Sequence, residues 1–92
     1  MSDAFDPYKN AKNIDKHGVG FDRVADIDWA TAITSPDTRV AYGEERSLTY
    51  AMLDGRLYCL VWTVRGTALR PISLRRANTR ERKKYEKEIQ KK

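Results

Sequence analysis

Ten residues, RLYCLVWTVR at positions 56–65, decide the fold of this 92-residue chain. Successive side chains of a strand point to opposite faces, and here both sets are largely apolar. One set comprises Leu57, Cys59 and Val61, and the other comprises Tyr58, Leu60, Trp62 and Val64. A segment that is apolar on both faces is typical of a central strand, so the sequence predicts a sheet covered at least partly on both sides.

Turn signals on either side of this segment predict antiparallel neighbours. Asp54-Gly55 favours a tight hairpin before it, and Arg65-Gly66-Thr67 predicts a turn after it. Pro71 cannot donate to a ladder, so it is expected at an edge or a bulge of the sheet. Residues 37–46 are polar and are interpreted as a loop or an irregular edge hairpin. The expected strands are Ala30–Thr34, Ser47–Leu53, Arg56–Arg65 and Ala68–Arg75.

Helical patterns lie at both ends of the chain. Asp6-Pro7 favours a helix start and Gly18 a helix stop, and a second short helix is expected from Phe21 to Trp29. Asn78 with Glu81 three residues later resembles a capping box, which predicts a last helix over Thr79–Gln90. We therefore expect one α+β domain over residues 1–92. Two N-terminal helices and a C-terminal basic helix would pack on an antiparallel sheet of about four strands.

The net charge of +5 comes from 18 basic and 13 acidic residues, and it is uneven. Residues 65–92 alone hold eleven basic and three acidic residues. This basic end favours a polyanionic partner such as nucleic acid, and a solvated charged tail explains it equally well.

The cysteine count and hydropathy pattern narrow the class of protein further. One cysteine excludes a disulfide framework, and one cysteine with one histidine cannot supply a structural zinc site. No apolar run is long enough to cross a membrane, and the N-terminus lacks a signal pattern. We expect a cytoplasmic protein without a cofactor, a metal or a membrane partner.

Several strings follow one another in the order and spacing of a known family. They are Asp6-Pro7 with Lys9 and Asn13, Lys16-His17-Gly18-Val19 with Phe21, Asp37 with Arg39, Tyr42-Gly43-Glu44-Glu45-Arg46, Gly55-Arg56-Leu57, Val61-Trp62-Thr63-Val64-Arg65-Gly66, Ile72-Ser73-Leu74-Arg75-Arg76-Ala77, and Thr79-Arg80-Glu81-Arg82 with Tyr85. With them the chain resembles the BrnT family of bacterial type II toxins, relatives of the RelE-like ribonucleases, over roughly residues 5–86.

The resemblance implies a RelE-like fold and a toxin that inhibits translation by cleaving RNA. It also implies neutralisation by a BrnA-like antitoxin with a ribbon-helix-helix region. Two toxins and two antitoxins would form a complex that reaches operator DNA through the antitoxin. The other class of function that the residues allow is a non-enzymatic, basic nucleic-acid-binding or corepressor module.

The abundance of arginine fits RNA cleavage without a metal, in which the 2′-hydroxyl of the RNA attacks the adjacent phosphorus. Arg75 ends a strand and Arg82 opens a helix, so both are expected to clamp phosphate in one cleft. Tyr85 shares the helical face of Arg82 and is expected to stack on a base or pass a proton, or instead to anchor the helix.

Acid–base candidates complete the predicted site. His17 titrates near neutrality, although a histidine before Gly18 also suits a helix C-terminus. Glu45 could act as a base or orient an arginine, as could Glu44, and both could simply be solvated. The residues expected to bind RNA are Arg39, Arg46, Arg76, Arg80, Lys83 and Lys84.

Overall fold

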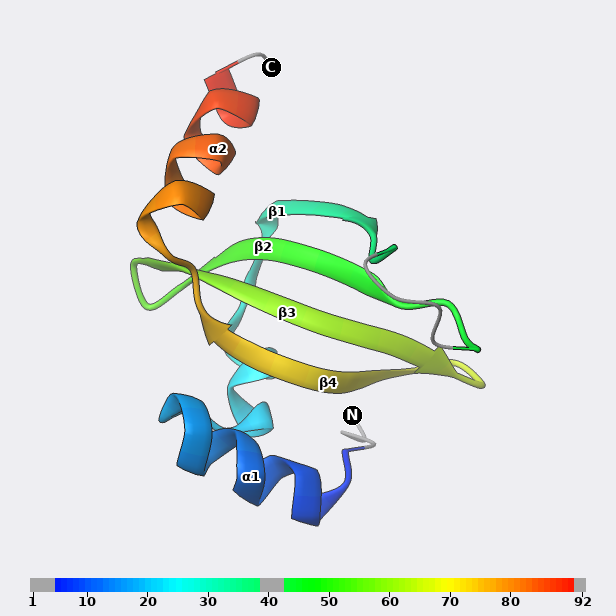
Figure 1. Cartoon of the computed structure of the whole chain (residues 1–92). Coiled ribbons are helices and arrows are strands. Elements are labelled where there is room, and N and C mark those ends of the chain that lie inside the picture. Colours follow the sequence, from blue (N-terminus) through cyan, green and yellow to red (C-terminus); the bar gives the residue numbers. More distant parts are fainter. Residues whose placement is uncertain (1–4, 39–42, 91–92) are drawn as a thin grey trace.

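A single antiparallel sheet with the strand order β1-β2-β3-β4 forms the centre of the molecule (Figure 1). The computed structural model describes residues 5–38 and 43–90. The strands are β1 (Asp28–Pro36), β2 (Ser47–Leu53), β3 (Arg56–Arg65) and β4 (Ala68–Arg76). The bounds predicted for β2 and β3 are confirmed, β4 runs one residue further than predicted, and the α+β class is confirmed.

The hairpin between β2 and β3 follows from its turn residues. Leu53 pairs with Arg56, which leaves Asp54 and Gly55 as a two-residue loop. Both loop residues have positive φ, 53° and 74°, the conformation that a right-twisted two-residue hairpin requires. The turn therefore fixes the register of the two central strands.

Strand β3 is an interior strand, as predicted. Cys59 and Leu60 point to opposite faces and are each 1% exposed. Tyr58 and Trp62 pack against the main core, as expected for apolar positions of a central strand. That core is formed by Val19, Phe21, Ile27, Ala51, Leu53, Leu60 and Leu74.

Strand β4 is an edge strand, and its proline lies at an irregularity in the ladder. Trp62 pairs with Pro71 and Val61 with Ser73, so Ile72 is the extra residue of a bulge. Both positions predicted for Pro71, an edge and a bulge, are confirmed.

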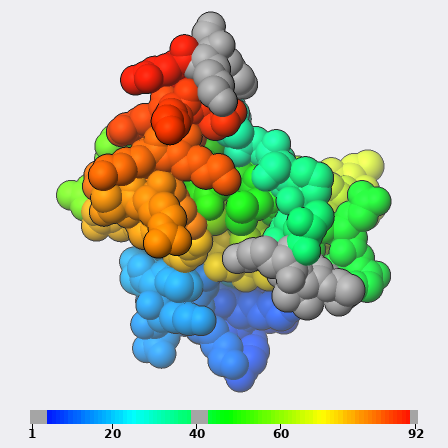
Figure 2. Space-filling model, turned by 45° about the horizontal axis from the view of Figure 1, so that its top comes forward, coloured from blue at the N-terminus to red at the C-terminus, as the bar shows by residue number. Residues whose placement is uncertain are grey.

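The two α-helices lie on opposite sides of the sheet (Figure 1). Helix α1 (Pro7–His17) begins where the carboxylate of Asp6 accepts from the Tyr8 amide at 2.8 Å, and it ends at Gly18 with φ 74°. Helix α2 (Thr79–Gln90) has the predicted bounds and the predicted capping box between Asn78 and Glu81. It covers only one end of the sheet, and β2 (green) and β1 (teal) remain visible beside it (Figure 2).

The second short helix expected from Phe21 to Trp29 is present only over part of that range, and it is not an α-helix. The chain forms a 3-10 helix η1 (Phe21–Asp26), and Ile27 is already extended, with ψ 133°. Phe21 and Val24 are three residues apart, which suits the three-residue period of a 3-10 helix and lets both pack on the core. Asp28 and Trp29 instead open β1, which is therefore longer at both ends than the predicted strand.

Candidate functional site

A cavity of about 470 Å³ opens where β4 passes into α2, beside the β2–β3 hairpin. Three arginines are among its lining residues, and we call it the arginine cleft. The lining residues that matter here are Arg56, Arg76, Arg82, Met52, Leu57, Tyr85 and Glu86. The cavity therefore combines cations with an apolar and aromatic wall.

The antiparallel ladder explains why these arginines meet. Arg56 is the first residue of β3 and Arg76 the last of β4, and Tyr58 of β3 pairs with Arg76. Arg82 follows on the first turns of α2, after a link of two residues. Residues distant in sequence are thus brought to one corner of the sheet.

The three arginines of the cleft form no ion pair with any described residue. By contrast, the guanidinium of Arg46 lies 3.1 Å from Glu44, and Arg23 pairs with Asp26 and Asp54. Unpaired guanidinium groups around one cavity create a positive potential, and their fork geometry matches phosphate oxygens. The arginine cleft can therefore hold a phosphodiester.

Arg75 is engaged differently, because both its terminal nitrogens donate to Glu81 at 2.8 Å. Glu81 also accepts from the hydroxyl of Tyr50 and from the Asn78 amide, each at 2.9 Å. The hydrogen bonds from Arg75 lower the pKa of Glu81 to about 2, and burial followed by the bond to Glu81 raises the pKa of Tyr50. Arg82 lines the arginine cleft, whereas Arg75 ties the sheet to α2. A catalytic role for Arg75 stays a prediction.

Tyr85 lines the arginine cleft and also holds α2 to the sheet. Its hydroxyl donates to the Thr31 carbonyl of β1 at 2.5 Å. This contact supports the anchoring alternative, and base stacking by the ring stays a prediction. A second, smaller cavity of about 300 Å³ lies under α2 between Tyr85 and Tyr50, and it includes Lys84.

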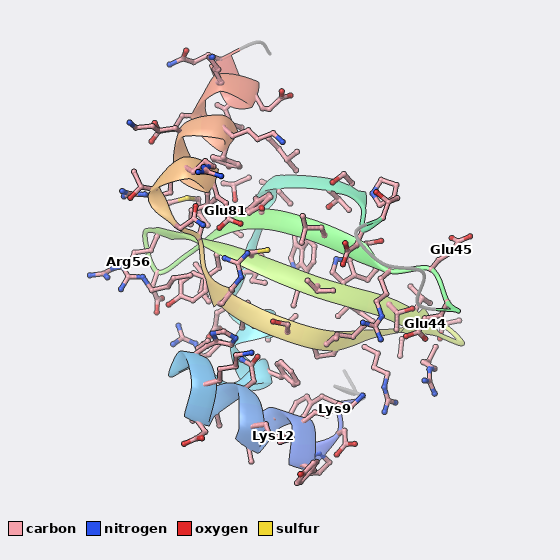
Figure 3. The ribbon with its side chains drawn as sticks, viewed as in Figure 1. Lys9, Lys12, Glu44, Glu45, Arg56 and Glu81 are labelled. Carbon is pink, nitrogen blue, oxygen red and sulfur yellow. The ribbon has the colours of Figure 1, made fainter. Side chains whose placement is uncertain are left out.

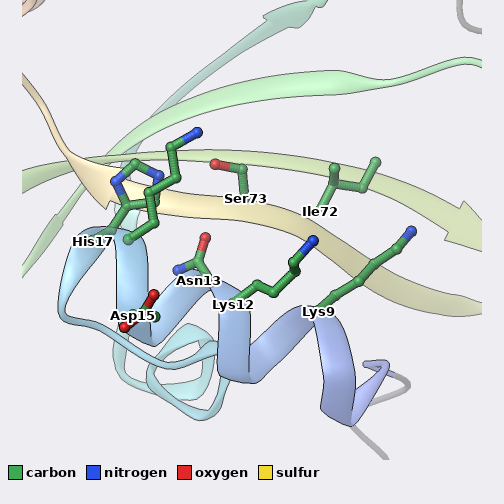
Figure 4. A pocket seen from close by; sticks show the side chains of 8 residues that line it. Lys9, Lys12, Asn13, Asp15, His17, Ile72 and Ser73 are labelled. Atoms are coloured by element: carbon green, nitrogen blue, oxygen red, sulfur yellow. The ribbon is translucent and has the colours of Figure 1, made fainter.

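His17 lies outside the lining of the arginine cleft, at the C-terminal end of α1 beside β4 (Figure 4). Burial lowers its pKa, and the positive charges of Lys16 and Arg75 lower it further. The imidazole is therefore mainly neutral at pH 7, and it lies close enough to Arg75 for the guanidinium charge to lower its pKa. Its acid–base role stays a prediction.

Glu44 and Glu45 lie at the opposite end of the sheet from Glu81 and Arg56 (Figure 3). The carbonyl of Glu45 accepts from the Thr63 hydroxyl at 2.7 Å. The structure therefore does not bring Glu45 or Arg46 together with the arginine cleft. Arg39 lies outside the described residues. Exposed positions on α2 carry Arg80, Lys83 and Lys84.

Sequence reasoning missed Arg56 as a site residue and Glu81 as a shared acceptor. Arg56 follows the hairpin signal Asp54-Gly55, so the predicted hairpin already placed it at the corner where β4 ends.

Among the described residues, no three His, Cys, Asp or Glu side chains gather to hold a metal ion. Neither α1 nor α2, within the described ranges, has the length and apolar character that a membrane-spanning helix needs.

A search of curated proteins finds no match to the chain. A comparison with protein families matches residues 5–81 to the family described as the ribonuclease toxin BrnT of type II toxin–antitoxin systems. The match spans most of the 92 residues and includes β1 to β4, Arg56, Arg76 and the first turn of α2. The chain therefore belongs to the BrnT family of ribonuclease toxins of type II toxin–antitoxin systems.

Proposed function

We propose that this chain is an endoribonuclease that cleaves RNA in the arginine cleft without a metal ion. One observation carries the proposal: Arg56, Arg76 and Arg82, which pair with no described carboxylate, line one cavity. Cleavage adds negative charge to the phosphate in the transition state, and fixed cations stabilise that charge more than they stabilise the ground state.

The reaction follows from the chemistry of RNA itself. The 2′-oxygen bonds to phosphorus and the bond from phosphorus to the 5′-oxygen breaks, which gives a 2′,3′-cyclic phosphate and a 5′-hydroxyl. Glu86 is the carboxylate that lines the cleft, and we assign it the 2′-hydroxyl proton. The leaving oxygen takes its proton from solvent. The apolar wall of Met52 and Leu57, with the Tyr85 ring, accommodates a base.

Membership of a type II toxin family implies an antitoxin partner. We propose that this partner is a BrnA-like ribbon-helix-helix protein that binds two to two and carries the complex to operator DNA. Free toxin would act in the cytoplasm, where cleavage of RNA stops translation. A growth arrest that the antitoxin reverses is the expected phenotype.

The experiment is RNA digestion by purified toxin, freed of antitoxin, in the presence of EDTA. Cleavage that persists and leaves 2′,3′-cyclic phosphate ends supports the proposal. Cleavage that stops in EDTA, or leaves 5′-phosphate ends, contradicts the mechanism. Binding of RNA without any cleavage would favour the non-enzymatic binding module instead.

A further inference from the structure

A second basic depression, separate from the arginine cleft, runs between α1 and the outer edge of β4. It encloses about 540 Å³, and we call it the lysine groove. Its residues that matter here are Lys9, Lys12, Lys16, His17, Ile72 and Ser73. Figure 4 shows Lys9, Lys12 and His17 reaching from α1 towards β4.

The lysines of the groove form a row along α1. Lys9, Lys12 and Lys16 occupy one flank and span about 10 Å of helix. None of them forms an ion pair with a described residue, although Asp15 also lines the groove. The ammonium group of Lys12 lies 5.1 Å from the centre of the Tyr8 ring. The groove therefore carries an unneutralised row of cations.

The edge of β4 is poorly suited to accept a further strand from a partner. The Asn13 side chain already donates to the Leu74 carbonyl at 2.8 Å and accepts from the Leu74 amide at 3.1 Å. Pro71 offers no amide, and the bulge at Ile72 interrupts the ladder. An extended acidic peptide could not continue the sheet here, so an occupant must be held by the lysine side chains themselves.

The lysine groove and the arginine cleft both adjoin β4. Ser73 of β4 lines the groove, and Arg76, three residues further along the strand, lines the cleft. We propose that the lysine groove binds the phosphate backbone of the same RNA strand that enters the arginine cleft. The inference rests on the proposed cleavage of RNA, and it adds a second binding surface remote from the reacting phosphate.

The test measures the binding of uncleavable 2′-O-methyl RNA to the full-length toxin freed of antitoxin. A trinucleotide fills the arginine cleft alone, and an oligonucleotide of about 12 nucleotides reaches the groove as well. The groove variant carries Lys9→Ala and Lys16→Ala, and keeps Lys12 on the Tyr8 ring. The control variant carries Arg65→Ala and Lys87→Ala, which remove the same charge from exposed positions outside both cavities.

The groove variant should bind the long oligonucleotide about tenfold more weakly than the control variant, with trinucleotide binding unchanged. The slope of log affinity against log salt should fall by about 0.7 for each lysine that no longer neutralises a phosphate. Equal affinities and slopes for the two variants would overturn the inference. A groove variant that binds RNA as wild type does but no longer binds the antitoxin would also overturn it, because the groove would then be a binding site for an acidic protein. Wild type that binds both oligonucleotides but never cleaves RNA would contradict the proposed function and not the groove.

Discussion

Arg75 and Glu81 form a two-pronged ion pair, with both nitrogen–oxygen distances at 2.8 Å. The pair connects β4, which ends at Arg76, to α2, which begins at Thr79 after a link of two residues. No described residue of α2 is buried, so polar contacts rather than a buried apolar face hold this helix to the sheet. The pair therefore keeps Arg82 of α2 beside Arg76 of β4 at the arginine cleft.

Replacing Glu81 tests this arrangement. Glu81→Gln removes the negative charge of the carboxylate that accepts hydrogen bonds from Arg75 and Tyr50. The substitution should lower the free energy of unfolding by roughly 1–2 kcal/mol, because the ion pair is only partly shielded from water. Urea denaturation measures the change. Glu86→Gln, which makes the same substitution at an exposed position, should change stability by less than about 0.5 kcal/mol. Equal effects would show that the ion pair does not hold α2.

Low pH should destabilise the folded chain, because it protonates the carboxylate of Glu81. The pKa of Glu81 falls from its usual 4.5 to about 2 in the folded chain. The unfolded state therefore binds the proton first, so this stabilisation is complete above about pH 5 and is lost as the pH falls towards 2. The stability gap between wild type and Glu81→Gln should narrow as the pH falls from about 5 to about 2. His17 titrates in both proteins, so it cancels; a constant gap would contradict the assignment.

Replacing Tyr85 tests whether its hydroxyl anchors α2 to the sheet or transfers a proton during catalysis. Tyr85→Phe keeps the ring in the arginine cleft but removes the hydroxyl that donates to Thr31. The loss of one partly buried hydrogen bond should cost about 1 kcal/mol of stability, with RNA cleavage within about threefold of wild type. Tyr8→Phe is the control, because Tyr8 is 67% exposed. A large fall in kcat at unchanged stability would instead make the phenol a proton-transfer group.

Asn13 should be the most costly polar residue of α1 to replace. Its side chain is buried and makes three hydrogen bonds, to Val19 once and to Leu74 twice. Asn13→Ala leaves these backbone groups without partners and should cost about 2–4 kcal/mol. Asn10→Ala loses one bond, to the Phe21 amide, and should cost about 1 kcal/mol. Thermal unfolding of the two variants compares them, and equal losses would contradict the role of Asn13.

Local signals in the sequence predicted most of the fold. The apolar alternation of Arg56–Arg65 and the Asp54-Gly55 turn are local, so the bounds of β2 and β3 could be predicted to the residue. A short helix after Gly20 was predicted, but its type and its C-terminal end were not, because an apolar spacing of three fits both an α-helix and a 3-10 helix. Only the packing of Phe21 and Ile27 on the core decides between them.

The site was predicted less completely, because side-chain partners depend on tertiary contacts. The sequence showed a capping role for Glu81 but not that Arg75 and Tyr50 converge on it. It indicated that Arg75 and Arg82 would clamp phosphate in one cleft, yet it did not show that Arg75 pairs with Glu81 while Arg76 lines the cleft. Glu45 was grouped with them although it lies at the other end of the sheet (Figure 3).

The most direct measurement is kcat/KM for cleavage of a defined RNA in EDTA by Arg76→Ala and Arg82→Ala, with Arg65→Ala as the matched control. Removing one cation that stabilises the transition state should lower kcat/KM by about 100-fold or more in each cleft variant, at unchanged folding. The control, at the exposed last residue of β3, should stay within about threefold of wild type. Cleft variants that cleave RNA as fast as the control would contradict the assignment of the arginine cleft as the catalytic site.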